Sequence, residues 1–144
     1  MRKPDWQTED GSIKLYCGDC RDVLPTLSGV DCVIADPPYA LGDKWKGGAG
    51  SGKSSWNIKQ GEAMKWDMEL LEGVELLPSL GECVIWGGNY YQLPPSRCWL
   101  VWDKCQPDTW TTGQCELAWT NLDRPIRAFR LCRCRSTDRE PFHQ

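Results

Sequence analysis

The chain has 144 residues, of which 40% are hydrophobic and 26% are charged. This composition predicts a folded protein with a core of its own and excludes an intrinsically disordered chain. No apolar run is long enough to span a bilayer, and the first residues lack the apolar core of a signal peptide. We therefore expect a single cytoplasmic domain over residues 1–144, without a membrane partner.

The cysteine content predicts reduced thiols. There are nine cysteines, and an odd count without a secretion signal argues against a disulfide framework. Cys17 and Cys20 form a C-x-x-C pair, but a zinc site needs four ligands in tetrahedral geometry, and no second pair has suitable spacing. We expect no metal site.

Positive charge is confined to two segments, although the net charge is −3. The segment Arg124–Arg139 has a local charge of +5, the segment 43–59 has +3, and the remainder carries −11. Such segregation is compatible with a local footprint for phosphates. A solvated basic tail and a lysine-bearing loop explain the same pattern.

The N-terminal part predicts a strand and a short helix. Ile13–Cys17 alternates apolar and polar residues, as a strand does. Gly18 and Asp19 follow, and Asp19 is placed to cap a short helix over Asp22–Leu27.

The apolar run Asp31–Ala35 predicts a short buried strand, and it ends at Asp36-Pro37-Pro38-Tyr39. The two prolines fix their own backbone angles and donate no N–H, so their carbonyls stay free as acceptors. A carboxylate and an aromatic ring lie beside them. This combination matches the exocyclic amino group of a nucleobase, which offers two N–H donors in the plane of a π-system.

Residues 40–60 predict a flexible loop rich in glycine and lysine. Residues 47–54 satisfy the literal P-loop pattern G-x-x-x-x-G-K-S. A working P-loop needs a buried strand directly before it and a helix directly after it, and neither is predicted here. We therefore interpret this segment as a loop, with a nucleotide-binding P-loop as the weakest alternative.

The rest of the chain predicts an α/β sheet. Apolar residues recur at helical spacing from Glu62 to Leu77. Four later segments have strand character: Glu82–Trp86, Arg97–Trp102, Cys115–Thr120 and Ile126–Leu131. Ligands of such sheets collect at the carboxyl ends of the strands, where we expect Asp36, Gly87 and Asp103.

Four segments in order resemble one enzyme family. They are the Asp-Pro-Pro-Tyr motif, Trp-Gly-Gly-Asn-Tyr-Tyr at 86–91, Trp-Leu-Val-Trp-Asp-Lys at 99–104 and Cys-Glu-Leu-Ala-Trp-Thr-Asn at 115–121. Together they resemble the amino-group DNA methyltransferases, which methylate N6 of adenine or N4 of cytosine. The order matches the permuted class with this motif near the N-terminus, particularly its phage-like members. The resemblance runs from about Ile13 to the C-terminus.

The resemblance implies a Rossmann-like fold, S-adenosylmethionine as cofactor and DNA as substrate. It makes Tyr39 the ring that stacks on a flipped base, with Pro38 beside it. It makes the Asp36 carboxylate and the Pro37 carbonyl the acceptors for the two amino hydrogens. Asp36 and Asp19 would also contact the cofactor. An aspartate at the first motif position favours adenine N6 over cytosine N4, and no cysteine nucleophile follows a proline as cytosine C5 chemistry requires.

Four basic residues are the expected DNA contacts: Lys44 and Lys46 after the catalytic motif, and Arg127 and Arg130 in the basic segment. Two features of the family are absent, namely the glycine-rich loop and the acidic residue that hold the methionine and ribose of the cofactor. We therefore expect a partial sheet that lacks its C-terminal strands.

A natural truncation, a gene remnant and one piece of a split enzyme all agree with this pattern. The expected further partner is a complementing polypeptide or a second copy of the chain. The alternative function is a catalytically inactive DNA-binding remnant of such an enzyme.

Overall fold

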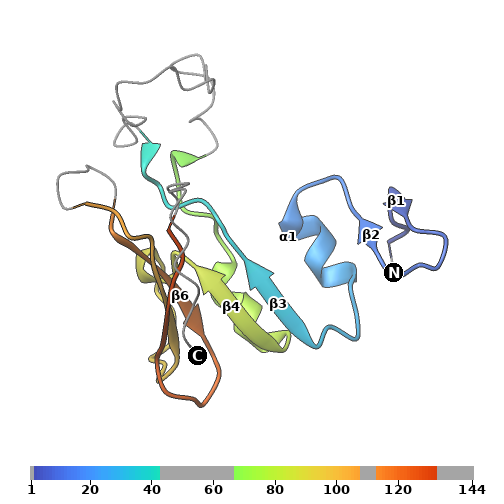
Figure 1. The fold of residues 1–144 in the computed structure, drawn as a ribbon. Coiled ribbons are helices and arrows are strands. Elements are labelled where there is room, and N and C mark those ends of the chain that lie inside the picture. The colour runs from blue at the N-terminus through green and yellow to red at the C-terminus, as the bar shows by residue number, and fades with distance from the viewer. Residues whose placement is uncertain (1, 43–66, 108–112, 133–144) are drawn as a thin grey trace.

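The main feature of the fold is a five-stranded mixed sheet in the order β3-β4-β6-β5-β7 (Figure 1). The computed structural model describes residues 2–42, 67–107 and 113–132. β6 is antiparallel to β4 and β5, whereas β3 is parallel to β4 and β7 is parallel to β5. The strands are β3 (Cys32–Ala35), β4 (Glu82–Trp86), β5 (Trp99–Asp103), β6 (Cys115–Thr120) and β7 (Arg127–Arg130).

These five strands confirm the five apolar segments expected from Asp31 onward, with shifts of one or two residues at their ends. The mixed α/β content is also confirmed, although strands predominate and the helices are short. The N-terminal strand differs from the expectation. Among the described strands, β2 (Lys14–Leu15) pairs with β1 (Trp6–Gln7) alone, and this hairpin lies apart from the main sheet, beyond the helix α1 (Cys20–Val23) (Figure 1).

The short helix capped by Asp19 is confirmed. α1 (Cys20–Val23) is followed by the 3-10 turn η1 (Leu24–Thr26), and the Asp19 side chain accepts a hydrogen bond from the Arg21 N–H at 2.9 Å. No helix within the described residues is long and apolar enough to cross a membrane.

The amphipathic helix expected from Glu62 to Leu77 is wrong for its described part. Residues from Asp67 onward form turns and then the 3-10 helix η4 (Val74–Ser79). Gly73 has a φ of 90°, a left-handed conformation that an α-helix cannot contain, and Pro78 lies inside η4. Val74 and Leu77 are nevertheless buried, so the spacing identified core residues but the wrong element. Residues 62–66 lie outside the described residues.

The core lies on one face of the sheet. Residues that pair directly across neighbouring strands lie on the same face of the sheet. The face that carries Cys83, Ile85 and Trp119 packs against η4 and η1. The buried cluster consists of Val74, Leu77, Cys83, Ile85 and Trp119, with Leu24, Val33, Ala35, Leu71, Tyr91, Leu93 and Trp99 packed against it.

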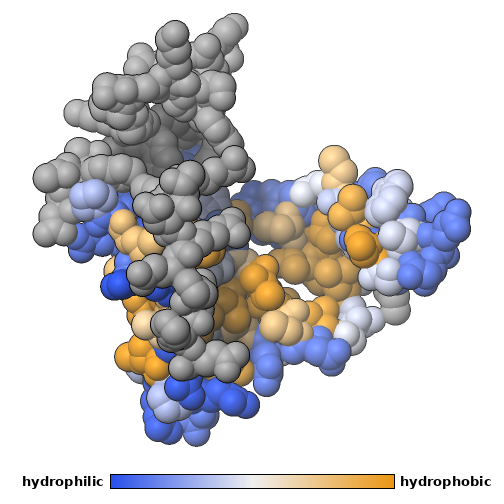
Figure 2. Space-filling view, in the orientation of Figure 1, coloured by the Kyte–Doolittle hydropathy of each residue, from blue (hydrophilic) through white to orange (hydrophobic). Residues whose placement is uncertain are grey.

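The opposite face carries an aromatic cluster. Trp102 and Phe129 are stacked with ring centroids 6.5 Å apart, and Trp86 meets both edge-on at 6.4 Å. Ile34 on the edge strand β3 is 75% exposed. Apolar atoms accordingly reach the surface over the middle of the molecule (Figure 2).

The expectation of reduced thiols is wrong for two cysteines. Cys105 and Cys132 form a disulfide that links residues 27 apart in the sequence. The pairing arises because β5 and β7 are parallel neighbours, so their carboxyl ends lie side by side. Cys17, Cys20, Cys32, Cys83, Cys98 and Cys115 are free thiols.

Candidate active site at the carboxyl edge of the sheet

The carboxyl ends of four strands meet at one edge of the sheet. β3, β4, β5 and β7 run in the same direction, so Asp36, Gly87 and Asp103 lie along this edge, as the sequence predicted. The antiparallel strand β6 begins at the same edge with Cys115 and Glu116.

The Asp-Pro-Pro-Tyr corner is internally bonded. The Tyr39 hydroxyl donates a hydrogen bond to Asp36 Oδ1, so the ring and the carboxylate are held together. The Tyr91 hydroxyl donates to the carbonyl of Pro38. Within the described part of the chain, no donor reaches the carbonyl of Pro37. The Pro37 carbonyl is thus an acceptor that no described donor reaches. Next to it, the Asp36 carboxylate accepts from the Tyr39 hydroxyl, which a ligand could displace.

Two residues that the sequence analysis did not identify hold this corner in place. The buried Asp67 carboxylate accepts hydrogen bonds from the backbone N–H groups of Tyr39 and Leu41, the latter at 3.3 Å. Tyr91 adds a second link, because its hydroxyl also accepts from the Leu71 N–H at 3.3 Å. Asp67 lay inside the expected helix, so no local signal marked it as a support.

The Tyr39 ring is covered on one face. Tyr90, in the 3-10 turn η5 (Gly88–Tyr90), stacks on Tyr39 with ring centroids 5.1 Å apart and an angle of 16° between the planes. Gly87 lets the Tyr39 ring lie directly against the backbone before η5, because a Cβ on residue 87 would lie 2.0 Å from Tyr39 Cε1. Its φ of 64° also favours glycine. Tyr90 is 44% exposed, so it can leave the stack without disturbing the core.

Burial is the main reason that the pKa of Tyr39 is raised above its ordinary value. The hydrogen bond to Asp36 and the negative charges of Asp36 and Glu116 act in the same direction. The phenol is therefore neutral across the physiological pH range. Glu116 itself is paired with the buried Lys104, whose Nζ lies 2.5 Å from Glu116 Oε1 and 5.8 Å from the centre of the Trp102 ring.

Asp19, the expected cofactor contact, is already engaged. Arg21 donates to both Asp19 oxygens, with Nε at 3.0 and 3.2 Å and Nη2 at 2.5 Å. These hydrogen bonds lower the pKa of Asp19 to about 2. Asp19 is thus both a helix cap and an ion-pair partner.

A cleft lies between α1 and the Asp-Pro-Pro-Tyr corner. Its volume is about 460 Å³, and it is lined by Arg21 on α1, by Pro38 and by residues 68–72. Glu69 and Glu72 contribute carboxylates to this lining. A second cleft of about 370 Å³, lined by residues such as Pro94, Arg97 and Asp123, lies at the opposite edge of the sheet.

The expected DNA contacts are not brought together. Arg127 pairs with Leu100, and Arg130 pairs with Asp103. Leu100 and Asp103 are three residues apart on β5, and successive side chains of a strand point to opposite faces of the sheet. The two arginines therefore lie on opposite faces. Arg130 is also bound to Asp103, with Nε and Nη2 each 2.8 Å from Oδ2. Lys44 and Lys46 lie outside the described residues, as does most of the 40–60 loop. Among the described residues, no cluster of three or more histidine, cysteine or acidic side chains suits a metal ion.

Compared with protein families, curated proteins and solved structures, the chain matches none of them.

Proposed function

We propose that this chain is the catalytic half of an amino-group DNA methyltransferase that acts on the exocyclic amino group of a flipped base, preferentially adenine N6. The observation that carries the proposal is the corner at the carboxyl end of β3. The four consecutive residues Asp36 to Tyr39 supply a carboxylate, a ring and a carbonyl that no donor of the described residues reaches. These are the groups that a planar amino substituent needs.

The base would bind by replacing contacts that the corner makes with itself. An incoming amino group displaces the Tyr39 hydroxyl from Asp36 Oδ1. Asp36 and the Pro37 carbonyl then accept its two N–H groups, which draws the nitrogen lone pair out of conjugation. Tyr39 stays neutral and contributes its face for stacking. Catalysis in this scheme consists of positioning and electrostatics.

We assign the cleft beside Pro38 to the nucleoside end of S-adenosylmethionine. Its volume lies within the range of small-molecule sites, and the carboxylates of Glu69 and Glu72 can accept hydrogen bonds from hydroxyl or amino groups. Asp19 would join them once Arg21 turns away from it. When bound, the cofactor supplies an electrophilic methyl group on its sulfonium. The described residues contain no glycine-rich loop for the methionine end, so a complementing polypeptide is part of the proposal.

Methyl transfer to duplex DNA tests the proposal, with the chain mixed with the cofactor half of a methyltransferase of the same permuted class. We expect Asp36→Ala to lower the rate at least about a hundredfold, the usual scale for losing a positioned electrostatic group, while DNA binding changes little. Asp31→Ala is the matched control, since Asp31 is an exposed aspartate at the other end of the same strand segment. Equal rates for the two variants would refute the assigned role of Asp36.

A DNA-binding remnant without catalysis is the second candidate. It is favoured by the observation that Asp19 and Asp36 both have partners within the chain. Isothermal titration with S-adenosylmethionine, its demethylated product and ATP separates the possibilities. The methyltransferase half binds the first two only when complemented, the remnant binds none of the three, and a P-loop protein binds ATP.

A further inference from the structure

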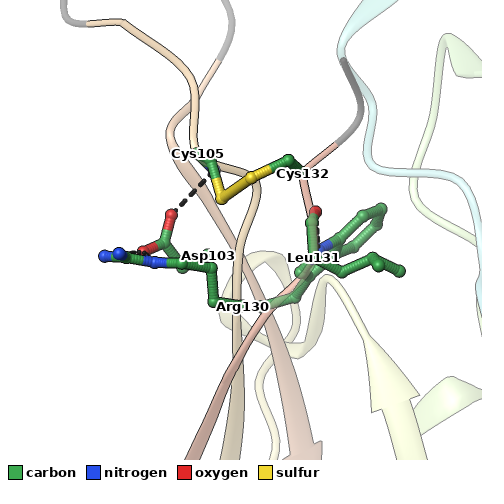
Figure 3. The surroundings of a disulfide bond; sticks show 6 residues. Asp103, Cys105, Arg130, Leu131 and Cys132 are labelled. Carbon is green, nitrogen blue, oxygen red and sulfur yellow. Dashed lines mark hydrogen bonds and ion pairs between the residues drawn. A yellow bond between two sulfur atoms is a disulfide. The ribbon is translucent and has the colours of Figure 1, made fainter. Parts of the chain in front are cut away.

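The disulfide joins the carboxyl ends of the parallel strands β5 and β7. Cys105 follows β5, Cys132 follows β7, and their Cα atoms are 4.9 Å apart (Figure 3). β7 is an edge strand of four residues, all of them exposed. Among the strands that the structure describes, it pairs with β5 alone. A covalent link at its end therefore bears strongly on whether β7 stays paired.

Four noncovalent contacts lie next to the disulfide. The Asp103 carboxylate accepts from the Cys105 N–H at 2.8 Å and binds Arg130 through its other oxygen. The Trp102 indole N–H donates to the carbonyl of Leu131 at 2.9 Å, and the Leu131 N–H donates to the carbonyl of Asp103 at 3.0 Å. Arg130 is mostly exposed, and exposed ion pairs contribute little to stability. Together with the stacking of Phe129 on Trp102, these contacts pair β7 with β5, and the disulfide adds a covalent link at the end of this edge strand.

Cys105 is held in an unfavourable backbone conformation. Its φ is 55°, in the left-handed region that residues with a Cβ avoid. The Asp103 hydrogen bond and the disulfide are the two contacts that hold Cys105 there. Breaking the disulfide removes one of these restraints, so the backbone at Cys105 can leave its left-handed conformation.

The two cysteines of the disulfide differ in exposure. Cys132 is exposed, whereas Cys105 is half-buried. A thiolate that attacks a disulfide needs an open approach to one sulfur. We assign the sulfur of Cys132, the more exposed of the two residues, as the target.

We propose that Cys105–Cys132 is a reversible thiol–disulfide exchange site, with a dithiol reductant as its substrate, and that its reduction releases β7 from the sheet. A thiolate of the reductant attacks Cys132 Sγ, the bond between the two cysteines breaks, and Cys105 leaves as a thiolate that takes up a proton. The second thiol of the reductant then attacks the mixed disulfide. Cys132 is released as a thiol, and the reductant is left as a disulfide, so two electrons and two protons pass to the protein.

The test uses trypsin, because β7 contains the cleavage sites Arg127 and Arg130. The purified 144-residue chain is incubated with or without dithiothreitol at neutral pH and without denaturant. We expect reduction within minutes and an increase of about tenfold in the rate of cleavage after Arg127 and Arg130, as local opening of an edge element predicts. Hydrogen exchange of the β4 amides is followed in parallel and should not change.

Two variants sharpen the result. Cys115→Ser removes a free exposed thiol near the same edge and should respond to dithiothreitol as the wild type does. The double variant Cys105→Ser/Cys132→Ser should be cleaved rapidly under both conditions.

The proposal is overturned if oxidised and reduced wild type are cleaved at equal rates, or if the disulfide reacts only after denaturation. It is also overturned if β4 loses protection together with β7, because reduction would then unfold the whole sheet. The wild-type comparison decides the matter even if the double variant does not fold. None of these outcomes depends on methyl transfer.

Discussion

Gly87→Ala should destabilise the protein by placing a methyl group inside the Tyr39 ring. The added Cβ would lie 2.0, 2.5 and 2.6 Å from three ring atoms of Tyr39. Carbon atoms in contact are normally about 3.5 to 4.0 Å apart, so the ring must move by roughly 1.5 Å. A shift of this size separates the Tyr39 hydroxyl from Asp36 and disrupts the stack on Tyr90.

The expected cost has two parts. A left-handed φ costs an alanine about 1 kcal/mol relative to glycine, and forced overpacking adds about 2 kcal/mol. We therefore expect the free energy of unfolding to fall by about 3 kcal/mol. For a chain of this length that corresponds to a fall in Tm of roughly 10 °C.

Gly29→Ala is the matched control. Its φ of 67° is close to the 64° of Gly87, but no heavy atom lies within 4 Å of the added Cβ. It should cost only the backbone part, about 1 kcal/mol. Urea unfolding followed by tryptophan fluorescence measures both variants. If Gly87→Ala and Gly29→Ala lose the same free energy of unfolding, the Tyr39 ring moves aside without an energetic penalty, and the Asp-Pro-Pro-Tyr corner is not rigid.

Three further predictions concern other parts of the molecule. If Arg127 contacts a phosphate, Arg127→Ala should reduce the slope of log affinity against log salt concentration for DNA binding by about one unit. Arg130→Ala should change this slope less, because Asp103 already neutralises Arg130. Equal slopes for both variants and the wild type would show that β7 does not contact DNA. Asn121→Ala should lower the free energy of unfolding by about 1 to 3 kcal/mol in urea titrations, since the Asn121 amide accepts from the Cys83 N–H and donates to the Gly81 carbonyl, each at 2.8 Å. Burial raises the pKa of Cys83 to about 11 from an ordinary 9.0, so the folded state holds this proton more tightly than the unfolded chain. Stability should therefore be full below pH 9 and decline toward pH 11, and the urea midpoint of Cys83→Ala should decline less over the same interval.

The strands could be predicted from the sequence because their signal is local. β3, β4 and β6 are runs of β-branched, aromatic and small apolar residues bounded by glycine, proline or polar residues. The carboxyl-edge grouping of Asp36, Gly87 and Asp103 followed from strand direction, a rule of the same kind.

The failures came from contacts between distant segments. The spacing at Met68, Leu71, Val74 and Leu77 is helical, but the left-handed Gly73 breaks the segment and lets it wrap over β4. Asp67 and Tyr91, which support the Asp-Pro-Pro-Tyr corner, lie 28 and 53 residues from the groups that they bind. The disulfide depended on which strands are neighbours, which cysteine spacing does not reveal.

The position of β6 has a consequence for synthesis on the ribosome. β6 lies between β4 and β5, although both are translated before it. β3 and β4 can pair early, but β5 has no neighbour until Cys115–Thr120 has left the exit tunnel. Until then Trp99 and Trp102 are exposed on a nascent chain that has only half a sheet. Assembly therefore waits for one late strand, and a translational pause before β6 would prolong the interval in which the unpaired β5 is open to chaperones or to aggregation.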